Sequence, residues 1–233
     1  MTSLKDGYIA MFGKDWYEVL EGFLKSTVFF DIANNIKQRR KVTTVYPESK
    51  LVFRAFRETG YYQTKIVILS QDPYPTEDPK ANGLAFCCAD SLKNSTSLVT
   101  MLKEIDRTYP ERKDDIDFDN IDRGNLQRWA KQGVLLVNSS LTVDKGKPNS
   151  HSKYWELFTR EVIKKLNDRR DVVFILMGSQ AQKFAKYINS SNFVIKTVHP
   201  AAESYGSGQF VGSGVFKQAN EHLLAINKQE IVW

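Results

Sequence analysis

Side chains of the kinds that enzymes use for chemistry follow or close four apolar runs of this chain. They are Gln71-Asp72-Pro73-Tyr74, Asn138-Ser139-Ser140, Gly178-Ser179-Gln180 and His199-Pro200. A carboxylate or an imidazole can act as an acid, a base or a stabiliser of charge, and an amide offers hydrogen-bond donors and an acceptor together. Each of these residues alone is more often a turn former, a cap or a structural histidine. Their recurrence at the ends of several runs favours one shared functional site.

The four apolar runs are the predicted strands that position these side chains. They cover residues 65–70, 134–143, 171–179 and 192–200, and they are rich in β-branched residues. Their nearly continuous hydrophobicity indicates strands that are covered on both faces. In open α/β sheets, ligands bind beyond the carboxyl ends of the strands, so we expect the polar side chains to meet there.

Segments with helical spacing of apolar residues surround and separate these strands. The predicted helices cover residues 15–37, 48–59, 97–109, 125–133, 153–169, 179–189 and 215–227. Alternating strands and helices predict a parallel sheet with helices on both sides. We therefore expect an α/β fold of three layers, α/β/α, with a central four-stranded parallel sheet, as a single domain over residues 1–233.

The charge and the cysteine content of the chain limit the kind of partner and the cellular compartment that we expect. Thirty-three Lys and Arg against 27 Asp and Glu give a net charge of +6, which suits a polyanionic partner but does not prove one. The only cysteines, Cys87 and Cys88, are adjacent and are predicted to be buried thiols in a reducing compartment. No signal peptide or membrane span is evident, so we expect an intracellular protein, cytoplasmic or nuclear. No metal-ligand cluster, phosphate loop or nicotinamide fingerprint is present, and no metal or cofactor is expected.

Five segments resemble motifs of the family-1 uracil-DNA glycosylases. They are SQDPYP, NGLAF, GVLLVNSSLTV, WELFTREVI and the C-terminal stretch from HP through ES to GSGVFKQAN, and the resemblance runs from about Lys65 to Trp233. Asp-Pro-Tyr alone is common, but the ordered series is highly specific. The resemblance implies a four-stranded parallel sheet between helices. It also implies hydrolysis of the bond between uracil and deoxyribose in DNA, the first step of base-excision repair.

The resemblance assigns two catalytic residues, because the sugar becomes cationic while uracil leaves as an anion. Asp72 would orient the water and stabilise the cationic sugar, and could also accept the proton. His199 would donate a hydrogen bond from a neutral imidazole to uracil O2. A loop-capping role is the structural alternative for Asp72.

Four further residues would bind the base. The Asn138 amide matches the donor and acceptor pattern of uracil and mismatches that of cytosine, unless it is only a strand-end residue bonded to backbone. Tyr74 would fill the space of the thymine methyl group. Phe86 would stack on the flipped base, unless it is only a core residue, and Gln71 would contribute through its loop backbone.

Contacts to the DNA backbone are expected from serines near helix starts and from one aromatic residue. These are Ser97, Ser179, Ser204 and Tyr205, although helix capping is nearly as good an explanation for the serines. The partner would be uracil-containing DNA, single- or double-stranded, and an acidic DNA-mimic inhibitor protein is a further partner implied by the family. We expect a monomer that binds no membrane.

Three departures from the family pattern stand out. Pro75 replaces the usual histidine, as in a poxvirus-type member, and Asn94-Ser95-Thr96 replaces a proline-rich turn. Glu203 occupies the place of the leucine that wedges into the DNA stack, so Tyr205, or else Gln209 or Phe210, would act as the wedge. Without an effective wedge the enzyme would prefer single strands, where unstacking costs less.

Two other functions stay open at this stage. One is a DNA-binding replication-accessory module of the processivity type, with weak or dispensable catalysis. Pro75 and Glu203 favour it, whereas the retained Asp72, Asn138 and His199 argue against it. The other is an enzyme of related fold that acts on a different base, such as a mismatch glycosylase.

Overall fold

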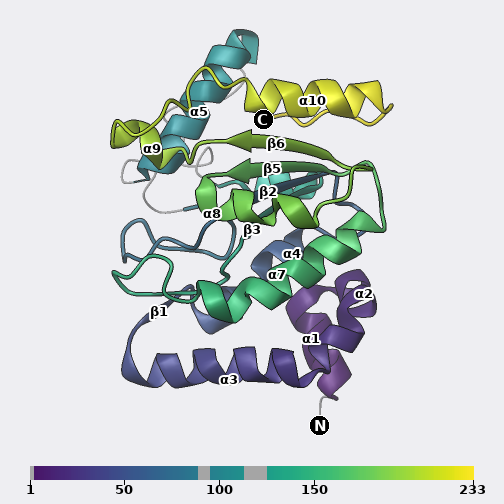
Figure 1. Ribbon diagram of the computed structural model, residues 1–233, viewed down its shortest axis with the longest axis vertical. Helices are drawn as coiled ribbons and strands as arrows, with labels where there is room; N and C mark the ends of the chain where they lie inside the picture. Colours follow the sequence, from purple (N-terminus) through teal and green to yellow (C-terminus); the bar gives the residue numbers. More distant parts are fainter. Residues whose placement is uncertain (1–2, 89–94, 113–124) are drawn as a thin grey trace.

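A four-stranded parallel sheet lies at the centre of the computed structural model, which describes residues 3–88, 95–112 and 125–233 (Figure 1). Its strands, in spatial order, are β3 (Val134–Asn138), β2 (Ile66–Ser70), β5 (Val173–Met177) and β6 (Phe193–Thr197). Every neighbouring pair is parallel, which confirms the predicted α/β architecture. Ser70 pairs with Asn138 in register, so the loop after β2 begins beside the end of β3.

Helices lie on both sides of the sheet, with α5 and α10 at one end of the molecule and α1, α2 and α3 at the other (Figure 1). The α-helices are α1 (Leu4–Phe12), α2 (Lys14–Leu24), α3 (Thr27–Val42), α4 (Arg54–Glu58), α5 (Thr96–Thr108), α6 (Gln127–Lys131), α7 (Ser152–Asn167), α8 (Ser179–Gln182), α9 (Ala201–Ser204) and α10 (Val215–Ala225). The 3-10 helices are η1 (Ser49–Leu51), η3 (Pro110–Arg112) and η5 (Lys183–Tyr187). A separate antiparallel pair joins β1 (Val45–Tyr46) to β4 (Val143–Asp144).

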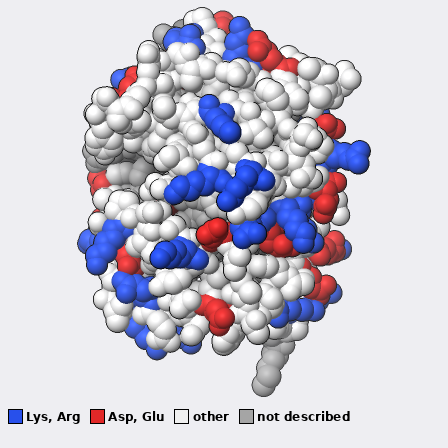
Figure 2. All heavy atoms as spheres, viewed as in Figure 1, with Lys and Arg blue, Asp and Glu red and all other residues white. Residues whose placement is uncertain are grey.

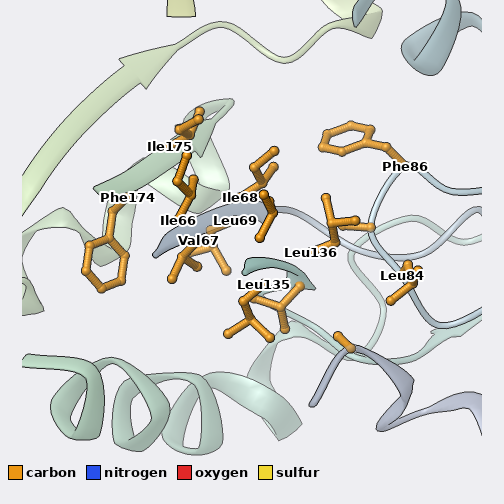
Figure 3. Packing of buried hydrophobic residues seen from close by; sticks show 14 of the residues in the cluster. Ile66, Val67, Ile68, Leu69, Leu84, Phe86, Leu135, Leu136, Phe174 and Ile175 are labelled. Atoms are coloured by element: carbon orange, nitrogen blue, oxygen red, sulfur yellow. The ribbon is translucent and has the colours of Figure 1, made fainter. Parts of the chain in front are cut away.

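The core is built on the strands β2, β3 and β5, in which every residue is buried. Figure 3 shows side chains of these strands packed together, with Leu84 and Phe86 at one end of the cluster. The edge strand β6 differs, because Lys196 is exposed and Phe193 is only half-buried. The prediction that all four strands are covered on both faces is therefore wrong for β6. Cys87 and Cys88 are buried thiols, as predicted.

Two predicted helices are each split in the structure. Residues 15–37 form α2 and α3, because Ser26 is extended and its hydroxyl caps α3 by accepting a hydrogen bond from the Phe29 amide. Residues 48–59 form η1 and α4, separated at Phe53, whose backbone is not helical. The apolar spacing continues across both breaks, which is why it did not reveal them. The helix α1, closed at its start by a capping box of Ser3 and Asp6, was not predicted.

The predicted strand 134–143 is also divided, and this division shapes the site. β3 ends at Asn138, and the amides of Ser139 and Ser140 then bond to the carbonyls of Ser70 and Gln71 at 2.9 Å each. The chain continues into β4 only after this turn. Residues 179–189 likewise form α8 followed by the 3-10 helix η5 rather than one helix. Of the helices in the described part of the chain, none is long and apolar enough to cross a membrane.

Candidate active site

A cavity of 410 Å³ opens at the carboxyl ends of the parallel strands. Eight of the ten predicted site residues line it, namely Gln71, Asp72, Tyr74, Phe86, Ser97, Asn138, His199 and Tyr205. Ser179 and Ser204 do not line it and are exposed beside it, at the start of α8 and the end of α9. The convergence expected from the strand ends is therefore present in the folded chain.

The carboxylate of Asp72 is held by a hydrogen bond to each of its oxygens. The Gln71 side-chain amide donates to Oδ1 at 2.9 Å, and the backbone N–H of Asn149 donates to Oδ2. Burial raises the pKa of Asp72, and these two hydrogen bonds oppose the rise. Because Asp72 is half-buried, its ionised carboxylate would interact more strongly with a cation in the cavity than it would in open water. A capping role, the structural alternative, is not what this geometry favours, because the carboxylate lines the cavity.

Asn149 reaches Asp72 because the loop after β4 is anchored by buried polar contacts that the sequence analysis missed. Asp144, only 3% exposed, pairs with Arg39 and with the Nε2 atom of His151 at 2.9 Å. Its backbone N–H donates to the Ser150 hydroxyl at 2.9 Å. Burial lowers the pKa of His151, and the partners of Asp144 keep the pKa of that carboxyl low although burial opposes them. The turn-forming sequence KGKPNS at 145–150 was the available signal for this loop.

The hydrogen bonds of His199 define its tautomer. The backbone N–H of Ala201 donates to Nδ1 at 3.2 Å, so the proton of the neutral ring lies on Nε2, which is 3.4 Å from the Ser70 hydroxyl. Burial lowers the pKa of His199 to about 4, which keeps the ring neutral at ordinary pH. The ring is thus a neutral N–H donor at the cavity wall. Gly178 makes room for it, since a Cβ there would lie 3.0 Å from the Cβ of His199.

The side-chain amide of Asn138 is buried at the cavity wall. The residue is 8% exposed and lines the cavity, yet its side chain makes no hydrogen bond within the part of the chain that the structure describes. The neighbouring Ser139 and Ser140 provide the backbone contacts that a strand-end residue would otherwise make. Its donors and acceptor are therefore available to a ligand, since a buried amide gains most from being paired.

Phe86 and Tyr74 form a fixed aromatic wall. Phe86 has a φ of +62°, a conformation that costs a bulky residue about 1–3 kcal/mol, and its ring centroid lies 5.4 Å from that of His199. The Tyr74 hydroxyl donates to the Phe86 carbonyl at 3.1 Å, so the Ser95 hydroxyl is left to donate to Tyr74. Burial raises the pKa of Tyr74, which keeps the phenol protonated. A strained backbone favours a role for Phe86 in the cavity rather than in the core alone.

The rim of the cavity carries one highly exposed aromatic residue, Tyr205, at 81% exposure. Phe210 is fully buried, which rules it out as a residue that enters DNA, whereas Gln209 is exposed. The carboxylate of Glu203 turns into its own loop and accepts hydrogen bonds from the amides of Phe210 and Val211 at 3.0 and 2.8 Å. Sequence reasoning placed Glu203 where a wedge should be, but could not show that it fastens the loop.

Two further observations concern the position of Ser97 and the question of a metal site. Ser97 is 5% exposed and lies within the first turn of α5, not before the helix. Asn94, in the turn that precedes it, lies outside the described residues. Among the residues that the structure describes, no three His, Cys, Asp or Glu side chains gather as metal ligands. The expectation that no metal or cofactor is needed stays a prediction.

Known proteins resemble this chain over nearly its whole length. The family model of the uracil DNA glycosylase superfamily matches residues 56–224. The uracil-DNA glycosylase of Proteus mirabilis is 39% identical over 222 residues, covering 94% of this chain and 95% of that protein. The enzyme of the same name from Vibrio vulnificus strain YJ016 is 40% identical, with 94% and 95% covered. A crystal structure of a variant mimivirus UNG in complex with UGI has a TM-score of 0.84 at 24% identity, covering 97% and 90% of the chains.

Proposed function

The chain belongs to the uracil DNA glycosylase superfamily and is an enzyme of the hydrolase class, and on that premise we propose how it removes uracil from DNA. A water oxygen bonds to C1′ of the deoxyribose. The bond between C1′ and uracil N1 breaks, and its electron pair leaves with the base. The products are free uracil and an abasic site, which initiates base-excision repair. Each half of the breaking bond develops charge, so the site must stabilise a cation and an anion.

Asp72 and His199 are the groups that meet these charges. The anchored carboxylate of Asp72 orients the water, stabilises the cationic sugar and accepts the proton of the water. The Nε2–H of His199 donates to uracil O2 as negative charge grows there, acting as a hydrogen-bond donor rather than an acid. Removing one such donor typically costs about 10²–10³-fold in kcat.

Asn138, Tyr74 and Phe86 select the base. The buried amide of Asn138 accepts a hydrogen bond from uracil N3–H and donates one to O4, whereas cytosine presents the opposite pattern. Tyr74 is held by two hydrogen bonds of its hydroxyl, so its ring is a rigid obstacle to the methyl group of thymine. Phe86 provides the face on which the flipped base stacks. Gln71 supports Asp72 and borders the base through its loop.

The observation that carries this proposal is the meeting of three groups in one cavity. The same cavity of 410 Å³ is lined by an anchored carboxylate, a neutral imidazole with its proton on Nε2 and a buried amide that makes no hydrogen bond to any residue that the structure describes. An accessory module that only bound DNA would have no use for them together. We therefore favour catalysis over the accessory function, and uracil over another base.

The finer assignments are proposals as well. The motifs quoted above support family 1, with Pro75 in the place where a poxvirus-type member also has proline. We propose that Ser97, Ser179 and Ser204 grip phosphates, that Tyr205 is the wedge and that the substrate is single- or double-stranded. A mimivirus relative of the same fold was crystallised with UGI, which supports an acidic DNA-mimic protein as a partner. We further propose a monomer that works in the cytoplasm or nucleus as one domain.

The direct test is uracil release from single- and double-stranded oligomers by the parent enzyme and the Asp72→Asn variant, without added metal. The parent should release uracil, and the variant should be slower by about 10²–10⁴-fold while it still binds DNA. Equal rates would remove Asp72 from the mechanism. DNA binding without any release by the parent would favour the accessory function.

A further inference from the structure

A second hollow, of 260 Å³, adjoins the active-site cavity behind a thin wall. The wall consists of two short segments, 138–139 and 148–149. The first residue of each segment lines the active-site cavity, and the second lines the hollow. Both segments also support the catalytic loop, since the Ser139 hydroxyl donates to the Gln71 carbonyl and the Asn149 amide to Asp72. A strand with its flipped nucleotide at Asp72 therefore has this hollow beside it.

Three exposed lysines surround the hollow and give it a positive charge. They are Lys153, Lys183 and Lys186, and together they define what we call the lysine groove. Its one acidic side chain is Glu156. None of the three lysines forms an ion pair within the described part of the chain; Lys183 donates to the Gln180 amide oxygen at 2.7 Å. Figure 2 shows basic side chains gathered on this face, where α7 and η5 lie.

The first turn of α7 adds to this potential. Ser152 and Lys153, the first two residues of a 16-residue helix, line the groove, so the positive end of the helix dipole faces it. Backbone phosphate is the anion that a DNA enzyme meets next to its target base, and lysines with hydrated point charges suit it. The negative charge of Glu156 would repel the same phosphate, so removing that charge should have the opposite effect to removing the lysine charges.

We propose that the lysine groove binds backbone phosphates of the DNA strand adjoining the flipped nucleotide. The inference rests on the proposed function, because it takes uracil DNA as the substrate. It extends the substrate site beyond the catalytic cavity, from the Asp72 loop to α7 and η5. The groove contributes affinity without sequence preference, since phosphate contacts position a strand and do not read its bases.

The test compares single-stranded oligomers that differ only in length on one side of the uracil. One carries the uracil with about one nucleotide on each side, and two others add about six nucleotides on the 5′ or the 3′ side. For the parent enzyme, extension on one side should raise kcat/KM. The triple variant Lys153→Gln/Lys183→Gln/Lys186→Gln should lose that gain in kcat/KM. A single strand releases about 0.7 counterion per phosphate contact, so each lost contact should lower kcat/KM by about fivefold at about 0.1 M salt. Glu156→Gln should instead increase the gain.

The matched control removes the same charge elsewhere. The variant Lys5→Gln/Lys37→Gln/Lys41→Gln, on α1 and α3, also lowers the net charge from +6 to +3 and should keep the full gain. The inference is wrong if both triple variants lose the gain equally, or if the groove variant keeps it. Uracil release from the shortest oligomer is the separate check on the proposed function, because failure there would count against the catalytic site and not against the groove.

Discussion

Replacing His199 by alanine should lower kcat by about 10²–10³-fold, and by the same factor at about pH 6 and about pH 8. The first part follows from the loss of one N–H donor aimed at the leaving base. The second follows from the state of the ring. Ala201 donates to Nδ1, and burial lowers the pKa of His199 to about 4, so the neutral form is the working form throughout this range.

The size of the pH effect separates a neutral donor from a cationic one. With a pKa of about 4, about one ring in a hundred is protonated at pH 6. A histidine with the ordinary pKa of 6.5 would be about three-quarters protonated there and only about 3% protonated at pH 8. If the cation were the catalyst, the advantage of the parent over the variant would therefore shrink about 25-fold between pH 6 and pH 8.

The assay is single-turnover uracil release by parent and His199→Ala enzymes across this pH range. Asp72 titrates in both enzymes, so its effect largely cancels in the ratio of their rates. A constant ratio is the expected result. A ratio that falls steeply towards alkaline pH would refute the neutral-donor argument, and nitrogen NMR of His199 would then show a proton on both ring nitrogens at pH 6. His199→Gln, which restores an N–H group, should recover part of the rate.

Three other predictions concern recognition, flipping and support. Asn138→Asp should begin to release cytosine, because a protonated carboxyl can pair with it; loss of uracil release with no cytosine release would count against Asn138 as the reader. Tyr205→Ala should lower kcat/KM on duplex by at least about tenfold more than on single strands, and equal losses would disqualify it as the wedge. Asp144→Asn should lower the free energy of unfolding by about 2 kcal/mol in urea titrations, because Arg39 and His151 lose a buried carboxylate. It should also slow uracil release, whereas unchanged stability and rate would show that this network does not support the Asp72 loop.

The sequence predicted the sheet and most of the site because both depend on local signals. Continuous apolar runs are distinctive of buried parallel strands, and the residue after such a strand lies at the ligand-binding edge. That logic located Asp72, Asn138 and His199, which line one cavity. Helix breaks were harder, since the break at Ser26 depends on a single capping hydrogen bond while the apolar spacing runs on.

The supporting contacts could not be predicted because they join residues far apart in the chain. The Asn149 amide meets Asp72 across 77 positions, and Arg39 meets Asp144 across 105. Nothing in the local sequence distinguishes the amide that holds the Asp72 carboxylate from any other turn amide. The tautomer of His199 was equally hidden, because it follows from the path of the chain at Ala201.

Two carboxylates that accept backbone hydrogen bonds hold the rim loop, the half-buried Glu203 and the buried Glu104. Glu203 fastens the loop to the amides of Phe210 and Val211. Glu104 in α5, fully buried, accepts from the amides of Gly212 and Gly214 at 2.6 and 2.7 Å and pairs with an arginine one turn on. The Glu203 carboxylate already accepts two backbone hydrogen bonds within its loop, which hold it away from the DNA phosphates that would repel it. We infer that the position that a leucine holds in the family shapes the loop here, and we propose that the exposed Tyr205, two residues later, faces the DNA.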